Sequence, residues 1–212
     1  TGSITNDDTS ASDPLVAITG TSNSTTDGFS FVAAQDLPPG TVVYFTEDEF
    51  DNSTLLFSSG ESVLQWTSPG TVFPKGDVVV VTETAPDTFA LTCSGTGGAT
   101  CGTLAVIVGG FALATQGETI YAYEDSDTDP TNGVSDIYAV LFTGTSATPG
   151  GTLPAIQDPT GIYLSALVVD GFPAASPLKT EYTPASRAIA VTEADFENPA
   201  NYDHEFPYGT GL

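Results

Sequence analysis

The sequence consists largely of short runs of β-branched and aromatic residues separated by Gly, Pro, Asn and Asp. Such runs are typical of strands, because these side chains pack well on a pleated surface and the separating residues form turns. No stretch shows a sustained helical period, and only residues 193–200 could hold a short helix. The pattern therefore predicts an all-β protein. The expected strands are residues 15–20, 29–34, 41–47, 62–68, 77–83, 103–110, 119–124, 137–144, 161–169 and 187–193.

Hydrophobic periodicity indicates how these strands are arranged. Several runs alternate apolar and polar residues, as residues 62–67 do, which fits a sheet with one face in water. Residues 78–81 and 104–108 are instead apolar without interruption, so we expect both runs to lie centrally in their sheets. Regular strand and turn spacing predicts a β-sandwich or jelly-roll of about ten strands.

Length and composition favour one domain. A chain of 212 residues with 40% hydrophobic content can bury a sizeable core, and one large sandwich fits as well as two small ones. Residues 1–14 are polar, acidic and aperiodic, and we interpret them as an N-terminal arm held by its own domain or by a neighbouring subunit. Residues 15–212 are expected to form a single β-sandwich domain.

Charge is the most unusual property of the composition. The chain has 27 acidic residues against three basic ones, Lys75, Lys179 and Arg187, which gives a formal net charge of -24. Nucleic acids and anionic membranes are excluded as partners, because both require clustered Lys and Arg. Such self-repulsion destabilises a compact state unless cations neutralise it, which indicates bound calcium or a salty medium. A surface kept acidic only for solubility is the alternative.

The two cysteines, Cys93 and Cys101, are separated by a Gly-rich segment that can bend sharply. We predict a local disulfide, which indicates an oxidising, extracellular environment. Free thiols in a reducing cytosol are the alternative. There is no run of eighteen apolar residues, and the polar start without any Met is what we expect of a secreted chain from which a signal peptide has been removed.

Residues 125–136, DSDTDPTNGVSD, have the oxygen-ligand spacing of an EF-hand loop, with candidate ligands at positions 1, 3, 5, 7 and 12. Pro130 replaces the usual Gly, the last ligand is Asp rather than Glu, and strands are expected on both sides, so this is not a true EF-hand. The spacing predicts a calcium loop between two strands, with a solvated acidic hairpin as the alternative. The predicted ligands are Asp125, Asp127, Asp129, Thr131 and Asp136.

A second acidic segment follows the strand predicted at residues 41–47. Neighbouring carboxylates repel one another unless a cation or water screens them, so calcium is a candidate here too, against a solvated loop. Asp27 lies in the turn before the strand predicted at residues 29–34. It could join this segment if that strand pairs with the strand predicted at residues 41–47. The predicted ligands are Glu47, Asp48, Glu49 and Asp51, together with Asp27.

The sequence contains few groups suited to catalysis. His204 is the only histidine, so a His-rich zinc site is impossible, and no GxSxG nucleophile frame occurs. Carboxylate pairs for glycoside hydrolysis are a weak indication where acidic residues are so abundant. We therefore expect no enzymatic activity.

Aromatic residues offer a different kind of site, because they can stack on sugars or pack against a partner. Trp66 lies in an alternating strand and is expected to anchor the core. Tyr202, Phe206 and Tyr208 are candidates for an exposed aromatic surface, of use to a carbohydrate or to a partner subunit.

Residues 28–83 resemble a segment of large secreted bacterial proteins, in which a phrase like FVALVDIPAGTTIYFTDNEW precedes GEGTLTWT and AGTVVTI. Residues 117–125 and 188–203 resemble that family's GDNLFAY and DNAAYNG elements, so the similarity spans residues 15–205. This chain has EDEFDN where the family has DNEW, without the tryptophan.

The resemblance implies an immunoglobulin-like sandwich, distantly similar to the lamin-tail domain, in extracellular surface and adhesin-like proteins. The family has no established enzymatic activity that carries over to this chain. With the strand pattern it predicts an all-β, immunoglobulin-like or jelly-roll-like β-sandwich of about ten strands.

These observations favour an extracellular or cell-surface structural protein, a calcium-stabilised subunit of a filament, tube or S-layer-like assembly. Its partners would be other copies of the same chain. The main alternative is a carbohydrate- or surface-binding adhesion module of a larger secreted protein. Extracellular glycans would then be its partners.

Overall fold

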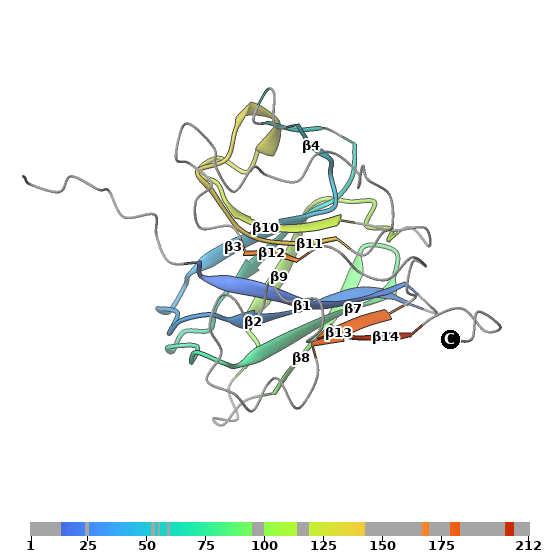
Figure 1. Ribbon diagram of the computed structural model, residues 1–212. Helices are drawn as coiled ribbons and strands as arrows, with labels where there is room; N and C mark the ends of the chain where they lie inside the picture. The colour runs from blue at the N-terminus through green and yellow to red at the C-terminus, as the bar shows by residue number, and fades with distance from the viewer. Residues whose placement is uncertain are drawn as a thin grey trace, which may run out of the picture.

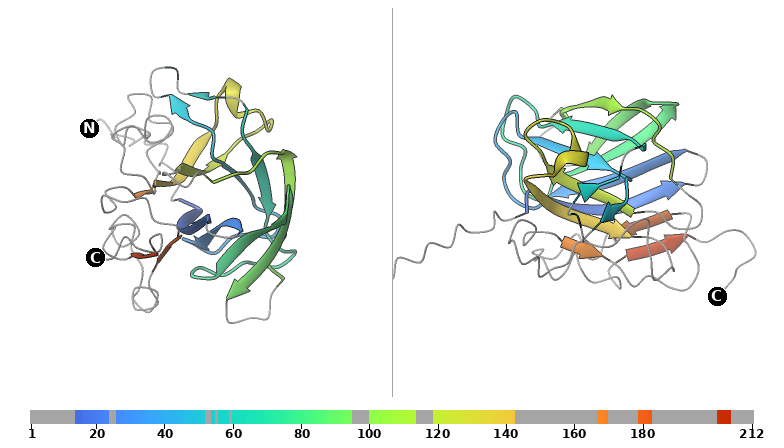
Figure 2. Two further views of the ribbon diagram at one scale, coloured as in Figure 1. Left: turned by 90° about the vertical axis from the view of Figure 1, so that its right-hand side faces the viewer. Right: turned by 90° about the horizontal axis from the view of Figure 1, so that it is seen from above.

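A computed structural model describes residues 14–23, 26–51, 54, 56–58, 60–94, 100–113, 119–142, 167–169, 179–182 and 202–205. Two six-stranded sheets pack face to face, which confirms the predicted all-β sandwich (Figures 1 and 2). Residues 1–13, the strand predicted at 187–193 and the short helix predicted at 193–200 lie outside the described residues. Pro14, which we assigned to the arm, is buried, and its carbonyl accepts a hydrogen bond from Gln35 at 3.4 Å.

The first sheet has the order β14-β13-β1-β2-β7-β8 and the second the order β12-β11-β10-β3-β6-β9. All pairings are antiparallel except that of β11 with β12, which is parallel. The strands of the first sheet are β1 (Val16–Asn23), β2 (Asp27–Ala33), β7 (Val78–Ala85), β8 (Thr88–Ser94), β13 (Lys179–Tyr182) and β14 (Tyr202–Glu205). Those of the second are β3 (Val42–Thr46), β6 (Val63–Thr67), β9 (Thr103–Val108), β10 (Thr119–Glu124), β11 (Asp136–Phe142) and β12 (Leu167–Val169).

A two-stranded hairpin and a 3-10 turn lie outside these sheets. Strands β4 (Phe50–Asp51) and β5 (Leu56–Phe57) form a hairpin of their own, and a 3-10 turn, η1 (Pro130–Asn132), lies between β10 and β11. The sequence pattern did not indicate β4, β5, β8, β13 or β14. Each of these strands is short or mixes apolar residues with Thr, Ser and charged residues, so its local pattern does not stand out from that of a loop.

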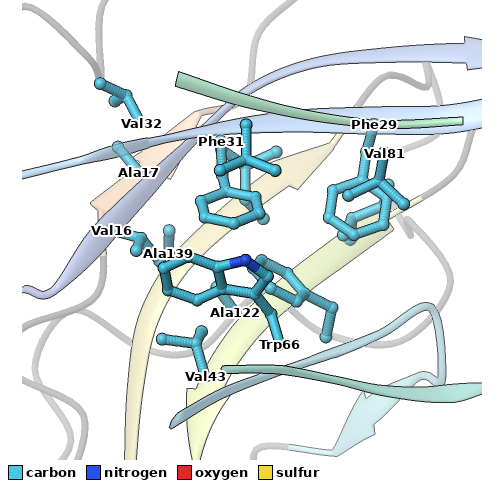
Figure 3. Packing of buried hydrophobic residues seen from close by; sticks show 14 of the residues in the cluster. Val16, Ala17, Phe29, Phe31, Val32, Val43, Trp66, Val81, Ala122 and Ala139 are labelled. Atoms are coloured by element: carbon cyan, nitrogen blue, oxygen red, sulfur yellow. The ribbon is translucent and has the colours of Figure 1, made fainter. Parts of the chain in front are cut away.

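The core lies between the two sheets, where apolar side chains from facing strands interdigitate (Figure 3). Trp66 of β6 is fully buried, and its indole makes edge contacts with Phe31 at 5.0 Å and Phe73 at 5.5 Å. The indole N–H donates to the carbonyl of Cys101 at 2.8 Å, so its polar atom is also satisfied. The prediction that Trp66 anchors the core is confirmed.

The two uninterrupted apolar runs occupy different positions. Strand β7 lies between β2 and β8, with Val79 and Val81 almost fully buried, as predicted. The prediction for residues 104–108 is wrong, because among the described residues β9 pairs only with β6 and is an edge strand, in which Ile107 is 40% and Val108 44% exposed. An apolar run shows that a strand packs against something; it does not show how many strands flank it.

The predicted disulfide between Cys93 and Cys101 is formed. Cys93 lies in β8 and Cys101 precedes β9, and these two strands are edge strands of opposite sheets. The bond therefore ties the two sheets together along one side of the sandwich. No helix in the described ranges is long and apolar enough to cross a membrane.

Gly102 fits tightly next to this disulfide. Its φ is +78°, and a Cβ there would lie 2.3 Å from the carbonyl oxygen of Thr67 and 2.8 Å from Nε1 of Trp66. Gly40 has nearly the same φ, +77°, but has no atom within 4 Å of a Cβ position. The two glycines thus separate the cost of the backbone conformation from the cost of the close contact.

We expect Gly102→Ala to destabilise the protein clearly more than Gly40→Ala. In both variants alanine must adopt the left-handed conformation, which lowers stability by about 1–2 kcal/mol. The clash at Gly102 lowers it by about 1–3 kcal/mol more. Urea unfolding followed by circular dichroism measures both. Equal costs in the two variants would show that the contact with Thr67 does not constrain β9.

Candidate functional site

Aromatic side chains cover part of the outer face of the second sheet. Tyr44 and Tyr123 are paired across β3 and β10 and stack with ring centroids 5.5 Å apart. Phe57 of the β4–β5 hairpin packs on Tyr123 and Tyr121 at 5.4 and 4.9 Å. Phe50 packs on Phe57 at 5.1 Å. This second buried cluster holds the hairpin against the sheet.

Both acidic segments found in the sequence adjoin this cluster. The acidic corner (residues 47–51) leads from β3 into the hairpin, and the Asp loop (residues 125–136) connects β10 to β11 and contacts β5 through η1 (Figure 1). The pKa of the Tyr123 hydroxyl is raised by burial and then by the charges of Asp125 and Asp48. The fold thus brings carboxylates from two distant parts of the sequence around one phenol.

The Asp loop is folded by its own side chains. Its first three aspartates each accept a hydrogen bond from the N–H two residues further on: Asp125 from Asp127 at 3.2 Å, Asp127 from Asp129 at 3.0 Å and Asp129 from Thr131 at 3.1 Å. The Asn132 amide also donates to Asp127 at 2.8 Å. Aspartate suits such turns because its short carboxylate reaches nearby N–H groups. The alternating spacing therefore supports the hydrogen bonds of the loop itself.

The predicted ligands of the Asp loop are distributed along it. Strands flank the loop, as expected, and Asp136 lies at its base, paired with Glu124 as the first residue of β11. The Thr131 hydroxyl donates to Asp129 at 2.5 Å. Among the described residues, no three Asp, Glu, His or Cys side chains are grouped so as to hold an ion. Calcium binding here remains a prediction, and it requires side chains of the loop to turn.

The acidic corner is held by hydrogen bonds to the segment around Ser58 and Glu61. Asp48 accepts hydrogen bonds from the Glu61 N–H at 3.2 Å and from the hydroxyls of Thr46 and Ser58 at 3.3 and 3.4 Å. Glu49 is exposed and accepts from the Ser58 hydroxyl at 2.8 Å. The corner is therefore fixed to the segment that precedes β6.

Two further members of the corner are placed differently. Asp51 is exposed in β4, and its carbonyl accepts from the Thr54 N–H at 3.3 Å. Glu47 is only 2% exposed, accepts from the Ser62 hydroxyl at 2.5 Å, and accepts from the Ala112 N–H at 3.3 Å. Glu47 is thus a buried structural acceptor.

The proposed strand pairing that would bring Asp27 to the acidic corner does not occur, because β2 and β3 belong to opposite sheets. The Asp27 carboxylate instead accepts a hydrogen bond from the Leu113 N–H at 3.0 Å. The neighbouring N–H, that of Ala112, donates to Glu47. Asp87 accepts from the Gly110 N–H at 2.7 Å. Three carboxylates from separate elements therefore hold the segment after β9.

Burial and hydrogen bonding shift the carboxyl pKa values in opposite directions. Desolvation raises the pKa of Glu47 to about 7, and it also raises the pKa of Asp48 and of Asp125. The pKa of Asp127 is lowered, because the Asn132 amide and the Asp129 N–H stabilise its charged form. The loop tip thus favours ionised carboxylates, whereas the groups nearer the sheet resist ionisation.

The remaining predicted residues are at the C-terminal end. Tyr202 and His204 belong to β14, an edge strand of the first sheet, where His204 pairs with Thr180 in register. Phe206 and Tyr208 lie outside the described residues.

Sequence reasoning did not identify Tyr123 or Asp87. Tyr123 reads as an ordinary strand residue, and Asp87 as a turn residue between β7 and β8; only the tertiary fold places other groups around them. Comparisons with protein-family models, with curated proteins and with solved structures found no match. The contacts within the chain are therefore the basis for assigning a function.

We expect the burial of Glu47 to make stability depend on pH. Its folded pKa of about 7 exceeds the ordinary value of 4.5, so the folded state holds the proton longer and stability falls as pH rises from 4.5 through 7. The full loss is about 3 kcal/mol, at 1.36 kcal/mol per unit. Glu47→Gln cannot ionise and should be more stable than the parent at pH 8 and similar to it at pH 4.

Urea unfolding between pH 4 and pH 8.5 measures this effect. Glu49→Gln is the matched control, because it removes the same charge at a neighbouring exposed position. Stability curves for the two variants that run parallel across this pH range would contradict the assignment to Glu47.

Proposed function

We propose that this chain is an extracellular structural protein, a calcium-stabilised β-sandwich subunit of a surface filament, tube or S-layer-like assembly. The observation that carries the calcium part is a pair of buried oxygen atoms two residues apart. Oδ2 of Asp125 and the hydroxyl of Tyr123 are both buried without a hydrogen-bond partner among the described residues. Buried polar atoms normally have partners, so each of these two atoms indicates a water or a cation next to it.

The surrounding charge favours a cation. Asp48 and Asp129 also act on the Tyr123 hydroxyl, and the whole sequence has only three basic residues to balance 27 acidic ones. Calcium accepts six to eight oxygen ligands in irregular geometry, including carboxylates, backbone carbonyls and water. The side chains of Asp127 and Asp129 are exposed, and turning toward such an ion would exchange their hydrogen bonds within the loop for contacts with the ion.

The extracellular assignment is supported by the disulfide that joins the two sheets. The resemblance to segments of secreted surface proteins agrees with it. A structural role is supported by the way in which the carboxylates are used: those of Asp27, Glu47 and Asp87 accept backbone N–H groups and hold the fold. In the part of the chain that the structure describes, both sheets end in strands that pair on one side only, and such edge strands can pair with other copies.

We expect calcium to raise the melting temperature by more than ionic strength alone. At calcium 100 times the dissociation constant, one site adds about 2.7 kcal/mol, which corresponds to a rise of several degrees. The double variant Asp125→Asn with Asp127→Asn should lose most of this rise. Its amide oxygens can still accept the N–H groups of Asp127 and Asp129, so these two turns of the loop are retained, and only the contact of the Asn132 amide with the second oxygen of Asp127 is lost.

Melting curves in EDTA, in millimolar calcium and in sodium chloride of matched ionic strength measure the effect. The control is Asp36→Asn with Glu83→Gln, which removes two charges from carboxylates that accept N–H groups outside the Asp loop. Equal melting temperatures in calcium and in sodium would show that the Asp loop is only a solvated surface.

A further inference from the structure

Within the described ranges, strand β9 has a backbone edge that pairs with no other strand. It is the last strand of the second sheet, and among the described residues it pairs only with β6. Its second row of N–H and C=O groups therefore faces away from the sheet. A free edge of this kind is a template for a strand from another chain.

The β9 edge is also neutral and apolar. Residues 88–94 and 100–113, which include β8 and β9, contain no charged residue in a chain with 27 acidic ones. Leu104 and Val106 pack against the core, whereas Ile107 and Val108 are 40% and 44% exposed. Natural proteins commonly protect edge strands with Lys, Pro, inward-facing charge or a bulge, and β9 has only a bulge near its C-terminal end.

Both ends of β9 are held in place. At its start, the disulfide fixes Cys101 to β8 and the Trp66 indole donates to the Cys101 carbonyl. Beyond its end, the Gly110 N–H donates to Asp87 at 2.7 Å. A strand fixed in this way loses little conformational entropy when a partner strand pairs with it.

We propose that two copies of this chain associate through their β9 edges, which pair as antiparallel strands and join the second sheets into one continuous sheet. The inference rests on the proposed structural function and names its interface. Antiparallel pairing of like strands follows a two-fold axis, so each copy offers the other the same surface.

The proposed assembly requires contacts between copies of this chain, and charge favours this edge as the contact. Two molecules of formal net charge -24 repel each other wherever their acidic surfaces meet. Pairing through β9 brings neutral segments together. The Asp loop joins β10 to β11, which are separated from β9 by β3 and β6, so it stays out of the contact. The regular part of the edge is Thr103–Val106, because a bulge interrupts the pairing with β6 between Val106 and Val108.

The test is sedimentation velocity of the full chain in calcium over a range of concentrations. The edge variant is Ala105→Glu with Ile107→Glu. The matched control is Val72→Glu with Val80→Glu, which adds the same charge at exposed valines outside β8 and β9. We expect the edge variant to associate at least tenfold more weakly than the parent, and the control to remain within about threefold.

A second measurement does not depend on added charge. Ala105→Cys should form an intermolecular disulfide under mild oxidation, because the two edges lie side by side in the pair, whereas Val72→Cys should not. A parent that is monomeric at every concentration contradicts both the proposed assembly and this interface. A parent that assembles while the edge variant does so equally well overturns only the interface.

Two other results would also overturn the proposal. Equal weakening in the edge variant and in the control would show general charge repulsion. Loss of assembly on deletion of residues 1–13, without cross-linking of Ala105→Cys, would show that the N-terminal arm of a neighbour is the strand that pairs.

Discussion

The burial of Trp66 between the two sheets is the contact on which most of the structure depends. The indole packs on Phe31 of the opposite sheet and on Phe73, and its N–H holds the carbonyl of Cys101. Through Cys101 the same contact fixes the disulfide and the start of β9. A single buried side chain thus connects the core, the bond between the sheets and the free edge of the second sheet.

Carboxylates hold the parts of the fold that the core does not reach. In the Asp loop they accept N–H groups from their own turn, and after β9 they accept N–H groups from a distant segment. Burying a carboxylate is unfavourable, which the raised pKa of Glu47 reflects. A chain with so few basic residues stabilises its carboxylates by backbone donors, and we propose by calcium, where other proteins use Lys and Arg.

The distribution of charge agrees with a structural role. Acidic groups gather at the corner and the loop beside Tyr123, whereas residues 100–113 are neutral. A cation would reduce repulsion between subunits as well as within one subunit, because screening acts on both. Calcium and assembly through β9 are therefore linked in this proposal by a single property, the acidity of the rest of the surface.

The sequence by itself determined what depends on near neighbours. Runs of β-branched residues predicted the strands, the Gly-rich interval predicted the disulfide, and the alternating aspartates predicted an acidic loop between two strands, because each of these signals involves only residues that are close in sequence. The tertiary structure alone decided that β9 is an edge, that Asp27 and Glu47 meet the same segment, and that the β4–β5 hairpin covers Tyr123. Strand order depends on pairings between residues far apart in sequence, and identical apolar patterns fit a central strand and an edge strand equally well.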